Sequence, residues 1–240
     1  MRFGRKKSTD EGTQVDAAAE TTDEVMPADE TGDTAGGAAA RSQGPWDSSE
    51  VDLSAHTENR IDLGGLVVTG HPELELQLQV DETTGTVLAV VLAGAEAAVE
   101  LRAFAAPRNG DIWGDVRRQL AAEVAQHGGT ADEAEGLWGT ELRVMMPVQL
   151  PDGQHATQPS RVLGITGPRW LLRATLFGEA AVSPSEDGVV ERALRDVVVV
   201  RGDTAMSPGE PLPMQVPADA QRIDEGGLPV EPDPVDGADG

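Results

Sequence analysis

Alternation of apolar and polar residues is the clearest pattern in this chain, and it predicts a sheet of short strands. Between Leu74 and Val80 every second residue is leucine or valine, and the residues between them are glutamate or glutamine. This period of two is typical of a strand with one buried face. Asp81–Gly85 then predicts a hairpin loop that leads into an apolar strand. Further strands are predicted at 86–92, 97–105, 140–148, 161–166, 169–177 and 196–201, with 60–68 as an additional candidate.

Two segments have helical spacing instead. The first runs from about Asp111 to His127, where apolar residues recur on one stripe and a Gly-Gly pair follows. The second begins at Ser183-Pro-Ser-Glu186, which has the form of a capping box with proline at the first helical position. It is expected to end near Arg195. The sequence therefore predicts an α+β domain, with a mostly antiparallel sheet of about seven to eight strands and two helices packed on one face.

Composition changes along the chain and divides it into segments. Residues 1–50 have a short basic start followed by an acidic stretch that is poor in large apolar residues, and residues 218–240 are again acidic and rich in proline and glycine. Such segments bury too little apolar surface to offset the entropy of ordering, so we expect both to be disordered. Residues 51–217 are expected to form a single domain, with 203–217 as an extended arm along its surface.

Charge and cysteine content narrow the range of partners and compartments. The 240 residues carry 42 acidic and 18 basic side chains, a net charge of −24, and no cysteine. This field repels nucleic acids and anionic membranes, and it favours a monomer. The basic start Met1–Lys7 is not followed by an apolar region of the kind found in signal peptides. No apolar run is long enough for a membrane span, so we expect a cytoplasmic protein.

Catalytic and cofactor motifs are not found in the sequence. The four histidines are far apart, and neither a G-x-S-x-G elbow nor a phosphate-binding glycine loop occurs. Asp132, Glu133 and Glu135 follow the first helix in a predicted loop near Trp138, and we interpret them as a solvated acidic run. The sequence therefore gives no catalytic, cofactor-binding or metal-binding residue.

Arginines on the strands are the candidate binding residues. Arg102, Arg143 and Arg173 each fall on the outward side of a predicted strand, and Thr175 follows on the same side as Arg173. Neighbouring strands would gather these side chains into a face for a carboxylate or phosphate, which the planar guanidinium suits. The alternative is a solvated face on which Glu75, Glu100 and Glu141 pair with the arginines across the strands.

Several short segments together carry a resemblance to a known family. They are Gly44–Val51, Arg60–Gly64, Ala103–Arg108, Gly128–Asp132, Gly139–Leu142, Gly167–Leu171 and Val198–Gly202. With these motifs the chain resembles an uncharacterised actinobacterial family, domain of unknown function 3710, over about 44–217. The resemblance implies a cytoplasmic actinobacterial protein without an assigned activity, and it transfers no catalytic residue. The order of strands and helices is also similar to the PsbP-like architecture, an analogy of fold that implies no function.

These observations favour a non-enzymatic interaction module that binds an unidentified protein or a small anionic partner on its sheet face, without a cofactor. One alternative is an enzyme or nucleotide-linked factor with a dispersed site of acids and arginines. A deep pocket with convergent side chains would favour this alternative. The third is a weak nucleic-acid binder that uses Met1–Lys7 or the arginine face, whose binding would fall steeply with added salt.

Overall fold

The computed structural model describes residues 43–54, 59–150 and 152–217. The basic start and most of the two tails predicted to be disordered lie outside the described residues.

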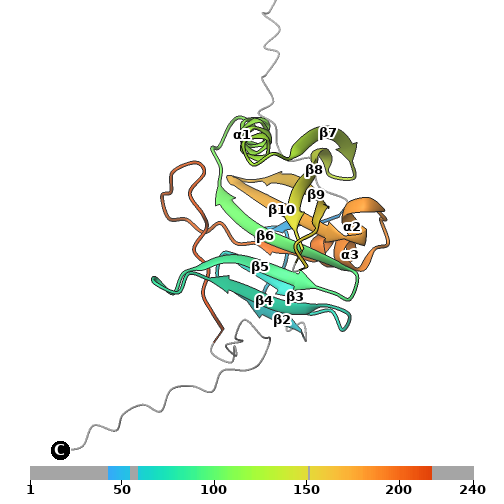
Figure 1. The fold of residues 1–240 in the computed structure, drawn as a ribbon. Coiled ribbons are helices and arrows are strands. Elements are labelled where there is room, and N and C mark those ends of the chain that lie inside the picture. The colour runs from blue at the N-terminus through green and yellow to red at the C-terminus, as the bar shows by residue number, and fades with distance from the viewer. Residues whose placement is uncertain (1–42, 55–58, 151, 218–240) are drawn as a thin grey trace, which may run out of the picture. The chain divides into compact units, whose positions relative to one another are not determined.

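A seven-stranded antiparallel sheet forms the centre of the described structure (Figure 1). Its spatial order is β4-β5-β6-β10-β9-β8-β7, so hairpin partners are mostly neighbours. The α+β class and the antiparallel sheet predicted from the alternation are thereby confirmed. The strands are β4 (Glu75–Val80), β5 (Val87–Ala93), β6 (Ala97–Ala105), β7 (Thr130–Gly136), β8 (Gly139–Gln149), β9 (His155–Gly167) and β10 (Trp170–Gly178).

A smaller four-stranded sheet has the order β1-β11-β3-β2. Its strands are β1 (Trp46–Asp47), β2 (Arg60–Asp62), β3 (Leu66–Thr69) and β11 (Val198–Val199). The candidate strand at 60–68 is therefore two strands, and the valine run contributes only two residues. Strand β1 pairs in parallel with β11, and Asp47 is buried, accepting a 2.7 Å hydrogen bond from the Trp170 indole. Ordered structure thus begins before residue 51, where we placed the edge of the domain.

The three helices of the described residues lie on opposite faces of the large sheet, which corrects the expectation that the helices share one face. Helix α1 (Trp113–Gln126) covers a small cluster that includes Leu142, Val162 and Leu171. Helices α2 (Glu179–Val182) and α3 (Val189–Arg195) instead border the larger core with β3 and β11. Leu171 and Leu172 are consecutive on β10 but belong to different clusters, because successive side chains of a strand point to opposite faces.

Two local predictions in the second half are wrong. Residues 130–136, interpreted as a loop, form the edge strand β7. The helix expected from Ser183 starts later, since α3 begins only at Val189, with Gly188 as its N-cap in place of the predicted Ser183. The residues from 183 to 187 are all exposed, whereas Val190 and Leu194 enter the larger core. Burial of this apolar stripe therefore selects the later start.

The segment that follows β11 lies against the domain in an extended form. Its backbone bonds to β6 through Leu212 N–Ala103 O at 2.9 Å and Ala105 N–Glu210 O at 2.8 Å. The Leu212 side chain is only 2% exposed and belongs to the larger core. Strand β5 pairs with β6 only as far as Leu101. The segment after β11 thus pairs with the following residues of β6, up to Ala105.

Candidate functional site

The structure brings together three of the four residues that the sequence nominated for binding. Arg173 on β10 lies directly opposite Arg102 on β6, and Thr175 lies opposite Glu100 on the same pair of strands. All three side chains are on the face of the sheet that carries α1, beyond the strands that α1 covers. We call Arg102, Arg173 and Thr175, with Glu100, the arginine face.

Arg102 and Arg173 have different surroundings although they are neighbours. Arg102 donates from Nε to a Glu100 carboxylate oxygen at 2.7 Å, which neutralises it locally. Arg173 is partly buried, and its guanidinium makes no hydrogen bond or ion pair with any residue that the structure describes. It stacks on Phe104 instead, 5.5 Å from the ring centre. Arg173 therefore keeps its donors available to a ligand.

The position of Arg173 is electrostatically unfavourable. Burial lowers the pKa of its guanidinium below its ordinary value, and the charge of Arg102 lowers it further, while Glu100 and Glu123 act in the opposite direction. The folded protein thus holds a cation where desolvation and a like charge both oppose it. An anion bound between the two guanidiniums would relieve both costs.

Arg143 does not belong to the arginine face. It lies opposite Arg161 in the pairing of β8 with β9, on the face of the sheet that carries the larger core. Its side chain is 57% exposed and reaches a Glu141 carboxylate oxygen at 3.5 Å. Glu141 was expected to pair with arginines on a solvated face, but its side chain is buried.

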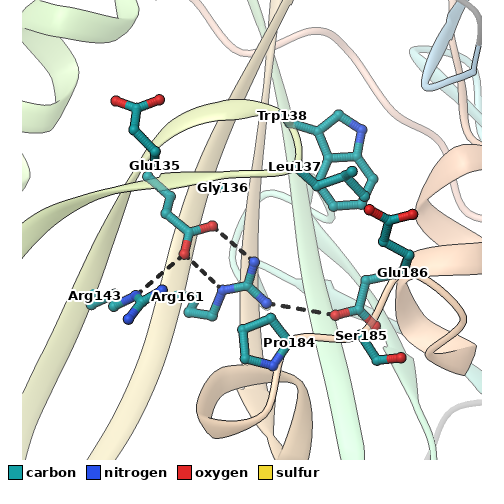
Figure 2. Close-up of a pocket in the computed structure, with 11 residues that line it drawn as sticks. Glu135, Gly136, Leu137, Trp138, Arg143, Arg161, Pro184, Ser185 and Glu186 are labelled. Carbon is teal, nitrogen blue, oxygen red and sulfur yellow. Dashed lines mark hydrogen bonds and ion pairs between the residues drawn. The ribbon is translucent and has the colours of Figure 1, made fainter.

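A pocket of about 390 Å³ opens on that second face, between the β7–β8 turn and the loop from 183 to 188. Figure 2 shows Trp138 and Leu137 on one side of the pocket and Pro184, Ser185 and Glu186 around another. Arg161 of β9 points into the space between them. This pocket was not predicted, because no motif in the sequence marks the residues that line it.

The wall of the pocket contains a buried ionic network. Arg161 donates to both oxygens of Glu141, at 3.0 and 2.8 Å, and to the carbonyl of Ala180 at 2.8 Å. The same guanidinium lies 3.6 Å from a carboxylate oxygen of Glu191 on α3. Arg161, Glu141 and Glu191 are all at least 96% buried as side chains. The network ties α2 and α3 to the centre of the sheet.

Neither location has the arrangement of a metal centre. Within 43–54, 59–150 and 152–217, no group of three or more metal-ligating side chains is close enough to hold an ion. The acidic run Asp132, Glu133 and Glu135 lies on β7, and only Glu135 lines the pocket. Both Glu141 oxygens are bound by Arg161, so this carboxylate cannot accept a proton from a substrate without breaking that pair. The geometry therefore favours binding of charged groups over acid–base chemistry.

The fold and these two locations define a class of protein: an antiparallel α+β domain with a cluster of charged side chains on each face of its large sheet. A model of the family described as Protein of unknown function (DUF3710) matches residues 44–223, three quarters of the chain. The chain belongs to this family, as its motifs indicated. No curated protein gives a significant match. Among the described residues no helix combines the length and apolar character needed to cross a membrane.

Proposed function

We propose that the protein is a non-enzymatic binding module that recognises an anionic group of its partner at the arginine face. The observation that carries the proposal is Arg173, a partly buried guanidinium beside a second arginine, without a hydrogen-bonding partner among the described residues. The planar donor fork of arginine matches a carboxylate or a phosphate. Phe104 holds the guanidinium plane from one side, which leaves its edge for the anion.

The ligand chemistry is a compact oxyanion. Arg102 is already paired with Glu100, so it contributes one partly neutralised charge, and Arg173 contributes a full one. Thr175 adds a hydroxyl on the same face, opposite Glu100. A partner with one carboxylate or phosphate group satisfies this arrangement. A polyanion, by contrast, is repelled by the net charge of −24 of the whole chain. Recognition of long nucleic acids is for this reason the less favoured alternative.

A titration followed by NMR of the arginine Nε–H signals tests the proposal. Inorganic phosphate and a short glutamate peptide are added in separate arms, at physiological ionic strength so that the global charge is screened. We expect saturable shifts of the Arg173 and Arg102 signals in at least one arm. Response to phosphate alone assigns a phosphate ligand, and response to the peptide alone assigns an acidic peptide.

Three variants decide whether the shifts report this site. Arg173→Gln and Arg102→Gln are expected to abolish the response, while Arg143→Gln, an arginine on the opposite face, is expected to retain it. If neither probe shifts Arg173, or if Arg143→Gln weakens binding as much as Arg173→Gln does, the proposal is wrong.

The cellular setting belongs to the same proposal. A cytoplasmic actinobacterial protein is what the family resemblance implies, and a chain without cysteine suits a reducing compartment. The strong negative charge favours a monomer through mutual repulsion of copies. Light scattering of the purified full chain tests this, since a mass of twice 25.1 kDa would contradict it.

The second candidate function is an enzyme with dispersed acids and arginines. The observation in its favour is the pocket of Figure 2, where Glu141, Glu191 and Arg161 converge. Against it stands the pairing of Glu141 with Arg161, which occupies both oxygens of this carboxylate and so hinders it from acting as a general acid or base.

A further inference from the structure

Glu191 is a buried carboxylate whose hydrogen-bonding capacity is incompletely used. Its side chain is 4% exposed, and its Oε1 accepts no hydrogen bond from any described residue. The nearest cationic nitrogen among the described residues is Arg161 Nη1, 3.6 Å from this oxygen. This distance allows an ion pair but is too long for a hydrogen bond. Burial of a charged oxygen without a donor is costly, and the oxygen belongs to a residue that lines the pocket.

Glu191 shares its nearest cation with another buried carboxylate. Glu141 occupies the fork of Arg161 through two short hydrogen bonds, so two buried carboxylates share one buried guanidinium. Arg143 is exposed and contacts the Glu141 oxygen, not Glu191. The buried group thus contains two acidic residues and one arginine, and Glu191 is the acidic residue that receives no hydrogen bond from that arginine.

The surroundings of the pocket favour a cation as well. Four glutamates and two arginines line it. A second hollow of about 570 Å³ shares Glu191, and every charged residue in its lining is a glutamate: Glu73, Glu96, Glu179 and Glu191. A concave surface lined by one sign of charge raises the local concentration of oppositely charged ligands.

Trp138 gives the pocket an aromatic wall. The indole N–H donates to the carbonyl of Gly44 at 3.3 Å, which holds the ring in place. The guanidinium of Arg195 already lies 6.0 Å from the ring centre, so this ring accepts a cation within the protein itself. An aromatic face beside a carboxylate is the usual arrangement for binding ammonium and guanidinium groups.

We propose that this pocket binds a protonated amine or guanidinium group, with Glu191 accepting its hydrogen bond and Trp138 packing against it. The ligand is either the side chain of a basic residue on a partner peptide or a free polyamine, since both present the same cation. The site is separate from the arginine face, lies on the opposite side of the sheet and has the opposite charge preference. This proposal and the proposed function depend on different residues, so either can be wrong while the other is right.

The indole N–H signal of Trp138, assigned with Trp138→Phe, reports binding in the full chain. The probes are Nα-acetyl-arginine amide, spermidine and the uncharged isostere Nα-acetyl-citrulline amide, at equal ionic strength. We expect a saturable shift with at least one cation and none with the citrulline compound. A shift with the arginine compound alone assigns a peptide side chain, and one with spermidine alone assigns a polyamine.

Glu191→Gln keeps the volume of the side chain and removes its charge, and is expected to weaken binding about tenfold or more. Glu82→Gln, at an exposed glutamate of the β4–β5 loop, is the matched control and leaves binding unchanged. Should Glu191→Gln disturb folding, Glu135→Gln and Glu186→Gln at the exposed rim give the second test, with smaller but measurable losses. No shift with either cation up to millimolar concentration, an equal shift with citrulline, or full binding by folded Glu191→Gln would each overturn the proposal.

Discussion

At the residue scale, Arg161 shows how a charge can be structural in the middle of a sheet. Its guanidinium donates hydrogen bonds on two sides, to the carboxylate of Glu141 and to the carbonyl of Ala180 in α2. Such a network contributes less to stability than its Coulomb energy suggests, because three charged groups lose their water. Its effect is therefore best seen when one partner is removed and the other charges stay buried.

Arg161→Met is expected to lower the free energy of unfolding by about 3–5 kcal/mol, because it leaves two buried carboxylates without a cation. Urea unfolding at neutral pH measures this loss. Arg118→Ala, which breaks an exposed pair with Asp115 on α1, is the control and is expected to cost about 0–1 kcal/mol. Equal effects of the two variants would contradict the structural role of Arg161.

Asp81 at the β4–β5 turn provides a prediction on pH. Hydrogen bonds from the Thr84 backbone and hydroxyl, and then from the Thr83 N–H, lower the pKa of the Asp81 carboxyl below 3.8. A lowered pKa means that the contribution of this group to stability is fully present above about 3.8 and is lost as the pH falls through the lowered pKa. Carboxyl ¹³C NMR should show Thr84→Ala raising the pKa of Asp81 toward 3.8. Thr83→Ala keeps its N–H and should leave it unchanged.

At the element scale, the sequence predicted most strands because their alternation is regular, and it missed those whose signal is weak. Strand β6 was predicted with its observed bounds, and α1 to within two residues at its start and one at its end. Strand β7 was not predicted because its residues are mostly small or acidic and show no apolar alternation. Such side chains are tolerated on an edge strand, where half of the backbone faces solvent.

The assignment of Arg143 to the arginine face failed for a different reason. The outward side of each strand was identified correctly, but the sheet is covered on both faces. Strand β6 turns Val99 and Leu101 toward the larger core, whereas β8 turns Leu142 and Val144 toward the cluster under α1. A side chain that points away from the buried side therefore lies on one face of the sheet in β6 and on the other face in β8. Periodicity within one strand cannot reveal this, because it depends on which layer covers each strand.

The segment after β11 makes a prediction at the same scale. Leu212 inserts into the larger core at 2% exposure, so Leu212→Ala is expected to lower the free energy of unfolding by about 2–5 kcal/mol. Val216→Ala, in the same segment but 44% exposed, should change it by less than about 0.5 kcal/mol. Chemical denaturation of the two variants compares them. A small effect of Leu212→Ala would mean that the segment rests on the domain without being part of its core.

At the scale of the whole described domain, the large sheet contributes side chains to two hydrophobic clusters, one on each of its faces. Strands β6, β9 and β10 carry side chains of the larger core on one face, and β9 and β10 also contact the smaller cluster on the other. Loss of these strands would expose both clusters. Loss of α1 exposes the smaller cluster alone. The domain is thus expected to unfold as one unit, with an earlier partial opening at the end where α1 and β7 lie.

Native-state hydrogen exchange with increasing urea tests this order. Amides of β6 and β10 should exchange most slowly and only by global unfolding, because these central strands have a paired strand on each side and contribute side chains to the larger core. Amides of α1 and β7 should exchange through a smaller opening of lower free energy, since α1 is held chiefly by contacts to β7, β8 and β9. Val116→Ala, which trims the apolar stripe of α1, should lower protection in α1 and β7 more than in β3 and β11. If β3 and β11 instead open separately from β6 while α1 stays protected, the small sheet is an independent unit, and the large sheet does not unite the two cores.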